Sequence, residues 1–193
     1  RSNHKEASPK QPADPTPTQK DNGNTVNNFV EQYTRLATEE QRENFLVGYN
    51  NDNEEPFNDD EVDILLRDLH STSEPFFKVA IINCLARNSN SFFVKNALIT
   101  LISDMSEDEL VLSHAAQDLR WYRLDADDYQ VVFDALVEYH GKERYENCTS
   151  SLIRILYRNR KKGALPYLLE LRSRGFYQGV YWVDNAELEQ PLL

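Results

Sequence analysis

The densest cluster of potential metal ligands in the sequence is a run of acidic side chains in its N-terminal half. Interpreted as a calcium-binding loop that begins at Asn50, the run places Asp52, Glu54 and Glu61 at the third, fifth and twelfth ligand positions. The first position is Asn rather than Asp, and Glu55 replaces the glycine that the sharp turn requires. These departures favour a polar loop whose carboxylates stabilise the N-terminus of the following helix. We therefore expect no metal site and no cofactor.

The four histidines do not form a catalytic or metal-binding constellation. His70 and His140 fall at the ends of predicted helices, where the helix dipole favours a cation, and Gly141 is a typical residue to follow a helix. His114 lies within a predicted helix and has no cysteine or second histidine at ligand spacing. The sequence also lacks the H-E-x-x-H, C-x-x-C, G-x-S-x-G and glycine-rich phosphate motifs. These absences predict a protein that is not an enzyme.

Composition narrows the classes of function further. The 193 residues are enough for one domain, and they carry 21 Lys and Arg against 32 Asp and Glu, a net charge of -11. Because affinity for nucleic acid depends on neutralising phosphates, this balance disfavours a nucleic-acid partner. No run approaches the roughly 18 apolar residues of a membrane span.

Residues 1–25 differ in composition from the rest of the chain. They contain four of the eight prolines and no aromatic residue, Leu, Ile or Val, so they cannot offset their own ordering entropy. We expect a disordered, proline-rich linker. One interpretation is a periplasmic or extracytoplasmic domain that this linker tethers to a removed anchor. The other is an untethered, cytoplasmic protein.

From Val26 onward the apolar residues follow helical spacing, and strand signals are almost absent until the last twenty residues. The first helix is expected to run to Ala37, and Thr38 with Gln41 forms the signature of a capping box for a second helix. Together with the acidic loop, these two helices form an expected N-terminal cap over residues 26–58. Further helices are expected near residues 59–70, 75–88, 91–103, 107–122, 126–140, 143–159 and 163–174.

The helical segments repeat along the sequence. Equivalent apolar residues of the first helices recur at one fixed spacing, and those of the second helices recur at the same spacing. The first set is Leu65, Ile99, Phe133 and Tyr167, and the second set is Leu85, Leu119 and Ile153. A fixed period of about 34 residues predicts stacked helical hairpins, each of which buries its apolar face against its neighbours.

The repeated segments resemble the short form of the HEAT-like repeats. Residues 74–87 begin with an acid–proline pair, contain the hydrophobic–basic pair Phe-Lys and end in Leu-Ala-Arg, which is similar to the second helix of that family. Residues 97–104 look like its first helix, and residues 163–171 are similar to its Ala-x-Pro-x-Leu signature. The resemblance covers about residues 59–175. It implies an all-α fold, a right-handed α-solenoid of HEAT-like hairpins that recur with this period.

The resemblance also implies a function and a surface. Arrays of this kind are protein-binding scaffolds, and their second helices line the concave face. Carried onto this sequence, the candidate contact residues are Lys78, Arg87, Gln117, Arg120, Trp121, Ser151, Arg154 and Arg158. The alternative is an enzyme such as a HEAT-like DNA glycosylase, which the net charge and the missing catalytic constellation disfavour.

The charges are segregated along the chain. Residues 50–75 contain nine acidic residues and one basic residue, whereas residues 151–175 contain seven basic residues and one acidic residue. One interpretation is the usual gathering of cations at helix C-termini. The other is a basic end that binds an acidic partner. The aromatic segment 176–193 is expected to form a C-terminal cap or an extension that contributes to an interface.

The repeat also predicts the state of the two cysteines. Cys84 falls in the second helix of the first repeat and Cys148 in that of the third. With helices packed 8–10 Å apart, an intervening unit separates them by roughly 20 Å, whereas a disulfide needs Cα atoms within about 7 Å. We expect both thiols to be reduced and buried.

Overall fold

The computed structural model describes residues 26–158 and 163–175, and within these ranges it contains α-helices and two 3₁₀ turns but no strand. The all-α prediction is therefore confirmed. None of the described helices combines the length and the apolar character that a membrane span would need. The expected linker (1–25) and the expected C-terminal cap (176–193) lie outside the described residues.

The observed helices follow the predicted order closely. They are α1 (Val26–Thr34), α2 (Glu39–Asp52), α3 (Asp59–Ser71), α4 (Pro75–Leu85), α5 (Phe92–Ser103), α6 (Glu109–Leu119), α7 (Ala126–Tyr139), α8 (Glu146–Arg158) and α9 (Leu165–Ser173). The 3₁₀ turns η1 (Ala86–Asn88) and η2 (Glu143–Tyr145) lie at the end of α4 and the start of α8.

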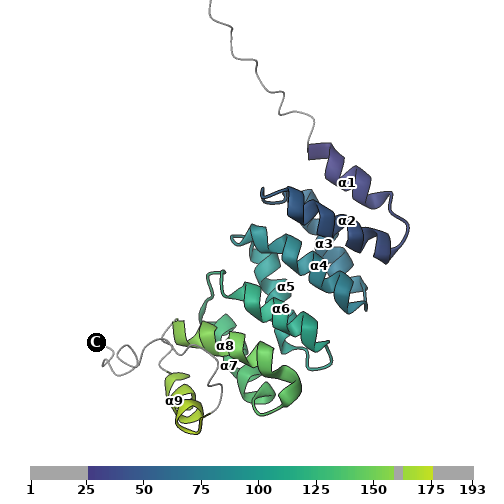
Figure 1. Ribbon diagram of the computed structural model, residues 1–193. Helices are drawn as coiled ribbons and strands as arrows, with labels where there is room; N and C mark the ends of the chain where they lie inside the picture. The colour runs from purple at the N-terminus through teal and green to yellow at the C-terminus, as the bar shows by residue number, and fades with distance from the viewer. Residues whose placement is uncertain (1–25, 159–162, 176–193) are drawn as a thin grey trace, which may run out of the picture.

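Helices α1 to α8 alternate between two layers (Figure 1). In the first-helix layer, α1 packs against α3, α3 against α5, and α5 against α7. In the second-helix layer, α2 packs against α4, α4 against α6, and α6 against α8. Every second helix therefore lies in the same layer, and Leu85, Leu119 and Ile153, which share one predicted repeat position, are all buried in the core.

The start of α2 shows how local sequence sets a helix boundary. Thr38 has extended backbone angles (φ -121°, ψ 155°), and its hydroxyl accepts a hydrogen bond from the backbone N–H of Gln41. The predicted capping box is confirmed, because the Gln41 side chain in turn accepts from the backbone N–H of Thr38. The first helix was expected to reach Ala37 but ends at Thr34. The chain must leave the helical conformation before Thr38 if this residue is to cap α2.

Neighbouring hairpins are joined by tyrosine hydroxyls. The Tyr122 hydroxyl donates to the backbone carbonyl of Leu85 at 3.3 Å, and the Tyr139 hydroxyl donates to that of Ile102 at 2.8 Å. Both acceptors lie 37 residues earlier in the chain, close to the C-terminal end of a helix where a carbonyl lacks an intrahelical partner. Each hydroxyl therefore supplies a partner for such a carbonyl and links one unit to the next.

A buried ion pair joins two helices of the first-helix layer. Lys95 of α5 lies against the carboxylate of Asp128 in α7, and both residues are more than nine-tenths buried. Asp128 also belongs to the capping box of α7, where its carboxylate accepts a hydrogen bond from the backbone N–H of Asp125 at 2.9 Å. One carboxylate thus starts a helix and compensates a buried cation.

The two cysteines are free and buried, as the repeat predicted. Burial raises the pKa of both thiols to about 12, and the Cys84 thiol lies 3.6 Å from the backbone oxygen of Leu46. Because the thiolate is the reactive form, we expect Ellman's reagent at pH 8 to react slowly with the native protein. Two thiols per chain should appear once the unreduced protein is denatured. A thiol that reacts at once in the native state, or a count of zero after denaturation, would contradict this expectation.

Candidate functional site

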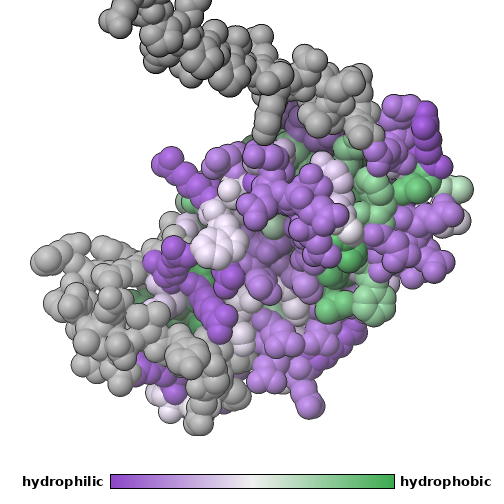
Figure 2. All heavy atoms as spheres, turned by 45° about the horizontal axis from the view of Figure 1, so that its top comes forward, coloured by the Kyte–Doolittle hydropathy of each residue, from purple (hydrophilic) through white to green (hydrophobic). Residues whose placement is uncertain are grey.

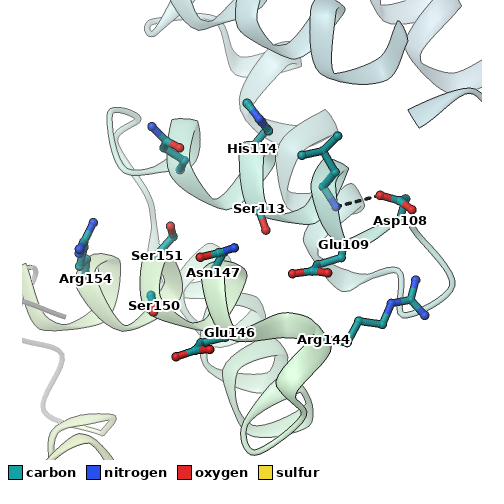
Figure 3. Close-up of a pocket in the computed structure, with 12 residues that line it drawn as sticks. Asp108, Glu109, Ser113, His114, Arg144, Glu146, Asn147, Ser150, Ser151 and Arg154 are labelled. Atoms are coloured by element: carbon teal, nitrogen blue, oxygen red, sulfur yellow. Dashed lines mark hydrogen bonds between the residues drawn. The ribbon is translucent and has the colours of Figure 1, made fainter. Parts of the chain in front are cut away.

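A groove of about 700 Å³ lies between α6 and α8 on the second-helix layer (Figure 3). Its walls are formed by one face of each helix together with residues just before them. The lining residues are Asp108, Glu109, Leu110, Ser113, His114, Gln117, Arg144, Glu146, Asn147, Ser150, Ser151 and Arg154. Apart from Leu110, every one of them carries a hydrogen-bonding or charged group, so the groove suits a polar ligand.

Carboxylates gather where the two helices begin. Asp108 caps α6, and its carboxylate accepts the backbone N–H of Leu110 at 2.8 Å, the dashed line in Figure 3. Glu109 and Glu146 are the first residues of α6 and α8. Acidic residues are favoured there because the N-terminus of a helix carries a partial positive charge. The same preference that starts the helices makes this end of the groove acidic.

His114 of α6 also lines the groove, and its imidazole is directed toward α4. Its Nδ1 lies 3.0 Å from the side-chain oxygen of Asn83 in α4, and burial lowers its pKa, which favours the neutral ring. A neutral ring that is hydrogen-bonded to an amide is a polar contact group. Among the described residues no set of three histidine, cysteine or acidic side chains is arranged to hold a metal ion.

The other end of the groove leads to an exposed tryptophan held between two arginines. The Trp121 side chain is 56% exposed, and the guanidinium carbons of Arg120 and Arg158 lie 4.7 and 5.8 Å from its ring centroid. We call Arg120, Trp121 and Arg158 the arginine–tryptophan cluster. Among the described residues neither of these arginines, nor Arg154 at the end of the groove, forms an ion pair with a carboxylate. The Nε of Arg120 is buried and has no hydrogen-bond partner in that part of the chain.

An uncompensated acid lies next to this cluster. Asp118 occupies the position in α6 that Cys84 occupies in α4 and Leu152 in α8, both of which are fully buried. Its Oδ2 atom is buried and makes no hydrogen bond with the described residues. Burial raises the pKa of Asp118 to about 6, and the charge of Arg120 opposes that rise only in part. The second-helix layer therefore contains a partly buried carboxylate at a position whose equivalents in α4 and α8 are core residues.

Six of the eight predicted contact residues lie together. Gln117, Ser151 and Arg154 line the groove, while the other three form the arginine–tryptophan cluster at its end. The prediction did not include the acidic end of the groove. No sequence pattern indicates that Asp108 and Glu109, at the start of a helix, also border an open groove.

The remaining two predicted contact residues are held by intramolecular partners. Lys78 forms an ion pair with Glu107, and both side chains are largely buried. Arg87 donates to the backbone oxygen of Asn50 at 2.7 Å, and its guanidinium lies 5.7 Å from the ring centroid of Phe57. Their positive charges already bind groups within the chain.

The acidic loop before α3 contributes to the start of that helix. Glu61 accepts the backbone N–H of Asn58 at 2.9 Å in the capping box of α3, which supports the polar-loop interpretation.

His140 does end α7 and is followed by Gly141 with φ of 78°, as expected. Burial and the nearby Arg174 lower the pKa of His140, which disfavours the cation expected at this helix end.

The rest of the described surface offers one further exposed aromatic pair. Phe92 and Phe93 at the start of α5 are 62% and 68% exposed, and their ring centroids are 6.0 Å apart. Figure 2 shows a face on which hydrophilic side chains predominate, with hydrophobic ones mainly toward its right-hand edge. The Phe pair lies on the first-helix layer and does not contribute to the groove.

Comparison of the chain with protein-family models, with curated proteins and with solved structures found no match. Function must therefore be argued from the groove and from the arginine–tryptophan cluster. Both lie on the second-helix layer, along α6 and α8.

Proposed function

We propose that this protein is a non-catalytic scaffold that binds a partner protein or peptide through its second-helix layer. In this proposal the two layers form a right-handed α-solenoid of HEAT-like hairpins, and the groove between α6 and α8 belongs to its concave face. The observation that carries the proposal is the exposure of Trp121 between two guanidinium groups. Tryptophan and arginine are the residues that most often dominate the energy of protein interfaces. We propose no catalytic step, cofactor or metal.

The charges around Trp121 indicate an acidic partner. Arg120, Arg154 and Arg158 have no carboxylate partner among the described residues, so they are available to carboxylates from another chain. A guanidinium binds a carboxylate with two parallel hydrogen bonds, which gives direction as well as energy. The net charge of -11 does not prevent this, because charges beyond about 8 Å are largely screened at physiological salt.

The location of the partner can be tested by photocrosslinking. A photoreactive phenylalanine analogue replaces Ser151 in the groove or, as a control, Val137, which is 48% exposed on α7 of the first-helix layer. We expect irradiation in an extract of the native host to produce a specific adduct from position 151 and not from position 137. The same adduct from position 137 alone would place the partner on the other layer and overturn the proposal.

The partner identified in this way allows a quantitative prediction. Reversing the charge of both Arg154→Glu and Arg158→Glu should weaken binding by about tenfold or more, because attraction is replaced by repulsion at two contacts. Isothermal titration calorimetry with the purified partner measures this change. The matched control is Arg67→Glu, an exposed arginine of α3 in the first-helix layer, which should leave the affinity within about twofold. Unchanged affinity in the double variant would contradict the proposal.

A further inference from the structure

The two ends of the groove carry opposite charge. Its acidic pole consists of Asp108, Glu109 and Glu146, and among the described residues neither glutamate forms an ion pair. Arg144 lies at the same end but offsets only one of the three charges, and its guanidinium lies 5.3 Å from the centroid of the Tyr145 ring. Carboxylates therefore remain in excess at this end.

The basic pole consists of Arg120, Arg154 and Arg158, and the carboxylate of Asp118, which interacts electrostatically with Arg120, offsets one of its three charges. Figure 3 shows Arg154 at the end of the groove opposite to Asp108 and Glu109. Arg120 and Arg158 extend this pole past the groove through their contacts with Trp121. The polarity follows from the helices themselves, since α6 and α8 each begin with a glutamate and end beside an arginine.

The separation of the poles fits a short segment of extended chain. At 1.5 Å per residue, α6 places Glu109 and Arg120 about 16 Å apart along its axis, and α8 places Glu146 and Arg154 about 12 Å apart. An extended peptide advances about 3.3 Å per residue, so roughly four to five residues span these distances. A single charged side chain is too short to contact both poles.

The floor between the poles offers hydrogen bonds rather than apolar contacts. Ser113, Asn147, Ser150 and Ser151 line it, and the hydroxyl oxygen of Ser113 is buried without a partner among the described residues. The side chains of Asn147, Ser150 and Ser151 are partly or fully exposed and can form hydrogen bonds with a ligand. An extended peptide carries an N–H and a C=O at almost every residue and can supply such partners.

We infer that the groove between α6 and α8 binds an extended, bipolar peptide segment, with carboxylates at the basic pole and cationic side chains at the acidic pole. This inference rests on the proposed function and adds the chemistry of the partner: an acidic cluster and a basic cluster separated by a few uncharged residues. A purely acidic segment would satisfy only one pole and would be repelled at the other.

The test compares two blocked peptides of identical composition. The bipolar peptide is Lys-Lys-Gly-Ser-Gly-Glu-Glu, and the alternating control is Lys-Glu-Gly-Ser-Gly-Lys-Glu. NMR titration of the full chain at 0.15 M salt gives both the affinity and the residues that shift. At this salt the Debye length is about 8 Å, so each pole acts separately. We expect the bipolar peptide to bind at least fivefold more tightly and to shift the amides of α6 and α8. Equal affinities would overturn the inference.

Reversal of the poles provides an internal control. The variants Arg154→Glu/Arg158→Glu and Glu109→Lys/Glu146→Lys each give the two poles the same sign of charge. In both variants the ratio of the affinities for the bipolar and the alternating peptide should fall to about one. The quadruple variant reverses the polarity at unchanged net charge. It should restore the preference to at least threefold, because a flexible peptide can bind in the opposite direction. A folded quadruple variant without a preference would overturn the inference. If the quadruple variant does not fold, the double variants decide: a preference for the bipolar peptide that persists in either of them would overturn the inference.

Failure of the bipolar inference can be distinguished from failure of the proposed function. A partner that crosslinks to position 151 and depends on Arg154 and Arg158, together with equal peptide affinities, would refute the bipolar inference alone. Absence of both the crosslink and any peptide-induced shift in α6 and α8 would refute the proposed function as well.

Discussion

Replacing Lys95→Met is expected to lower the free energy of unfolding by about 3–5 kcal/mol, the usual cost of leaving one buried charge without its partner. Lys95 and Asp128 are both more than nine-tenths buried, and Asp125 adds a second, more exposed carboxylate oxygen 3.6 Å from the Lys95 amine. Asp128 cannot turn to solvent when the amine is lost, since its carboxylate also holds the start of α7. The loss therefore affects the contact between α5 and α7. Urea denaturation at pH 7 measures the change in the free energy of unfolding.

Two variants separate the effect of charge from that of shape. In the double variant Lys95→Met/Asp128→Asn no buried charge remains at the contact, and the Asn side chain can still accept the hydrogen bond that starts α7. Most of the lost stability should return. The comparison variant Lys142→Met removes an exposed pair with Glu138 and should cost less than about 0.5 kcal/mol. If Lys95→Met cost no more than Lys142→Met, the buried pair would not hold α5 and α7 together.

The variant Asp118→Asn is expected to stabilise the protein by about 1–3 kcal/mol at pH 7, because the folded chain raises the pKa of Asp118 from 3.8 to about 6. Burial, which disfavours the charged carboxylate, is the main cause of this rise. A shift of one pKa unit corresponds to about 1.4 kcal/mol, so the ionised side chain costs up to about 3 kcal/mol at neutral pH. An amide has the same shape and no charge to desolvate. The control Asp63→Asn, at an exposed position of α3, should change stability by less than about 0.5 kcal/mol.

The same group makes stability depend on pH in a defined direction. Between about pH 4 and pH 6 the folded chain retains the Asp118 proton that the unfolded chain has released. The contribution of Asp118 to the free energy of unfolding therefore falls as pH rises through this window and is constant outside it. Other carboxylates act oppositely, such as Asp104, whose pKa is lowered by hydrogen bonds from Ser106. The difference in the free energy of unfolding between wild type and Asp118→Asn isolates the contribution of Asp118. A difference that stays constant from pH 4 to pH 7 would contradict this prediction.

Apolar spacing was sufficient to predict the helices, because each helix buries one face and the spacing along the sequence reflects that face. Leu85, Leu119 and Ile153 were aligned by the repeat period, and all three lie in the core. The same alignment places Asp118 between Cys84 and Leu152. This register could have identified Asp118 as a partly buried acid, a signal that sequence reasoning missed.

Partners of charged side chains were much harder to predict. Lys78 and Arg87 lie on second-helix segments as expected, yet each is paired with a group that is distant in the sequence. No local pattern shows which cation meets an acceptor of a neighbouring unit and which, like Arg154, does not. That choice depends on side-chain reach and on the offset between hairpins, which the period alone does not fix.

The tyrosine hydrogen bonds and the buried ion pair that join neighbouring hairpins affect how the chain folds. The tertiary contacts of Tyr122, Tyr139 and Lys95 join residues only 33 to 37 positions apart. Chains dominated by such short separations have low contact order and lose little entropy at each closure, so they fold rapidly. During synthesis, a hairpin can dock as soon as its successor has left the ribosome, without waiting for the C-terminus. In the proposed repeat array, we expect assembly to start wherever two adjacent hairpins first meet and to spread from there.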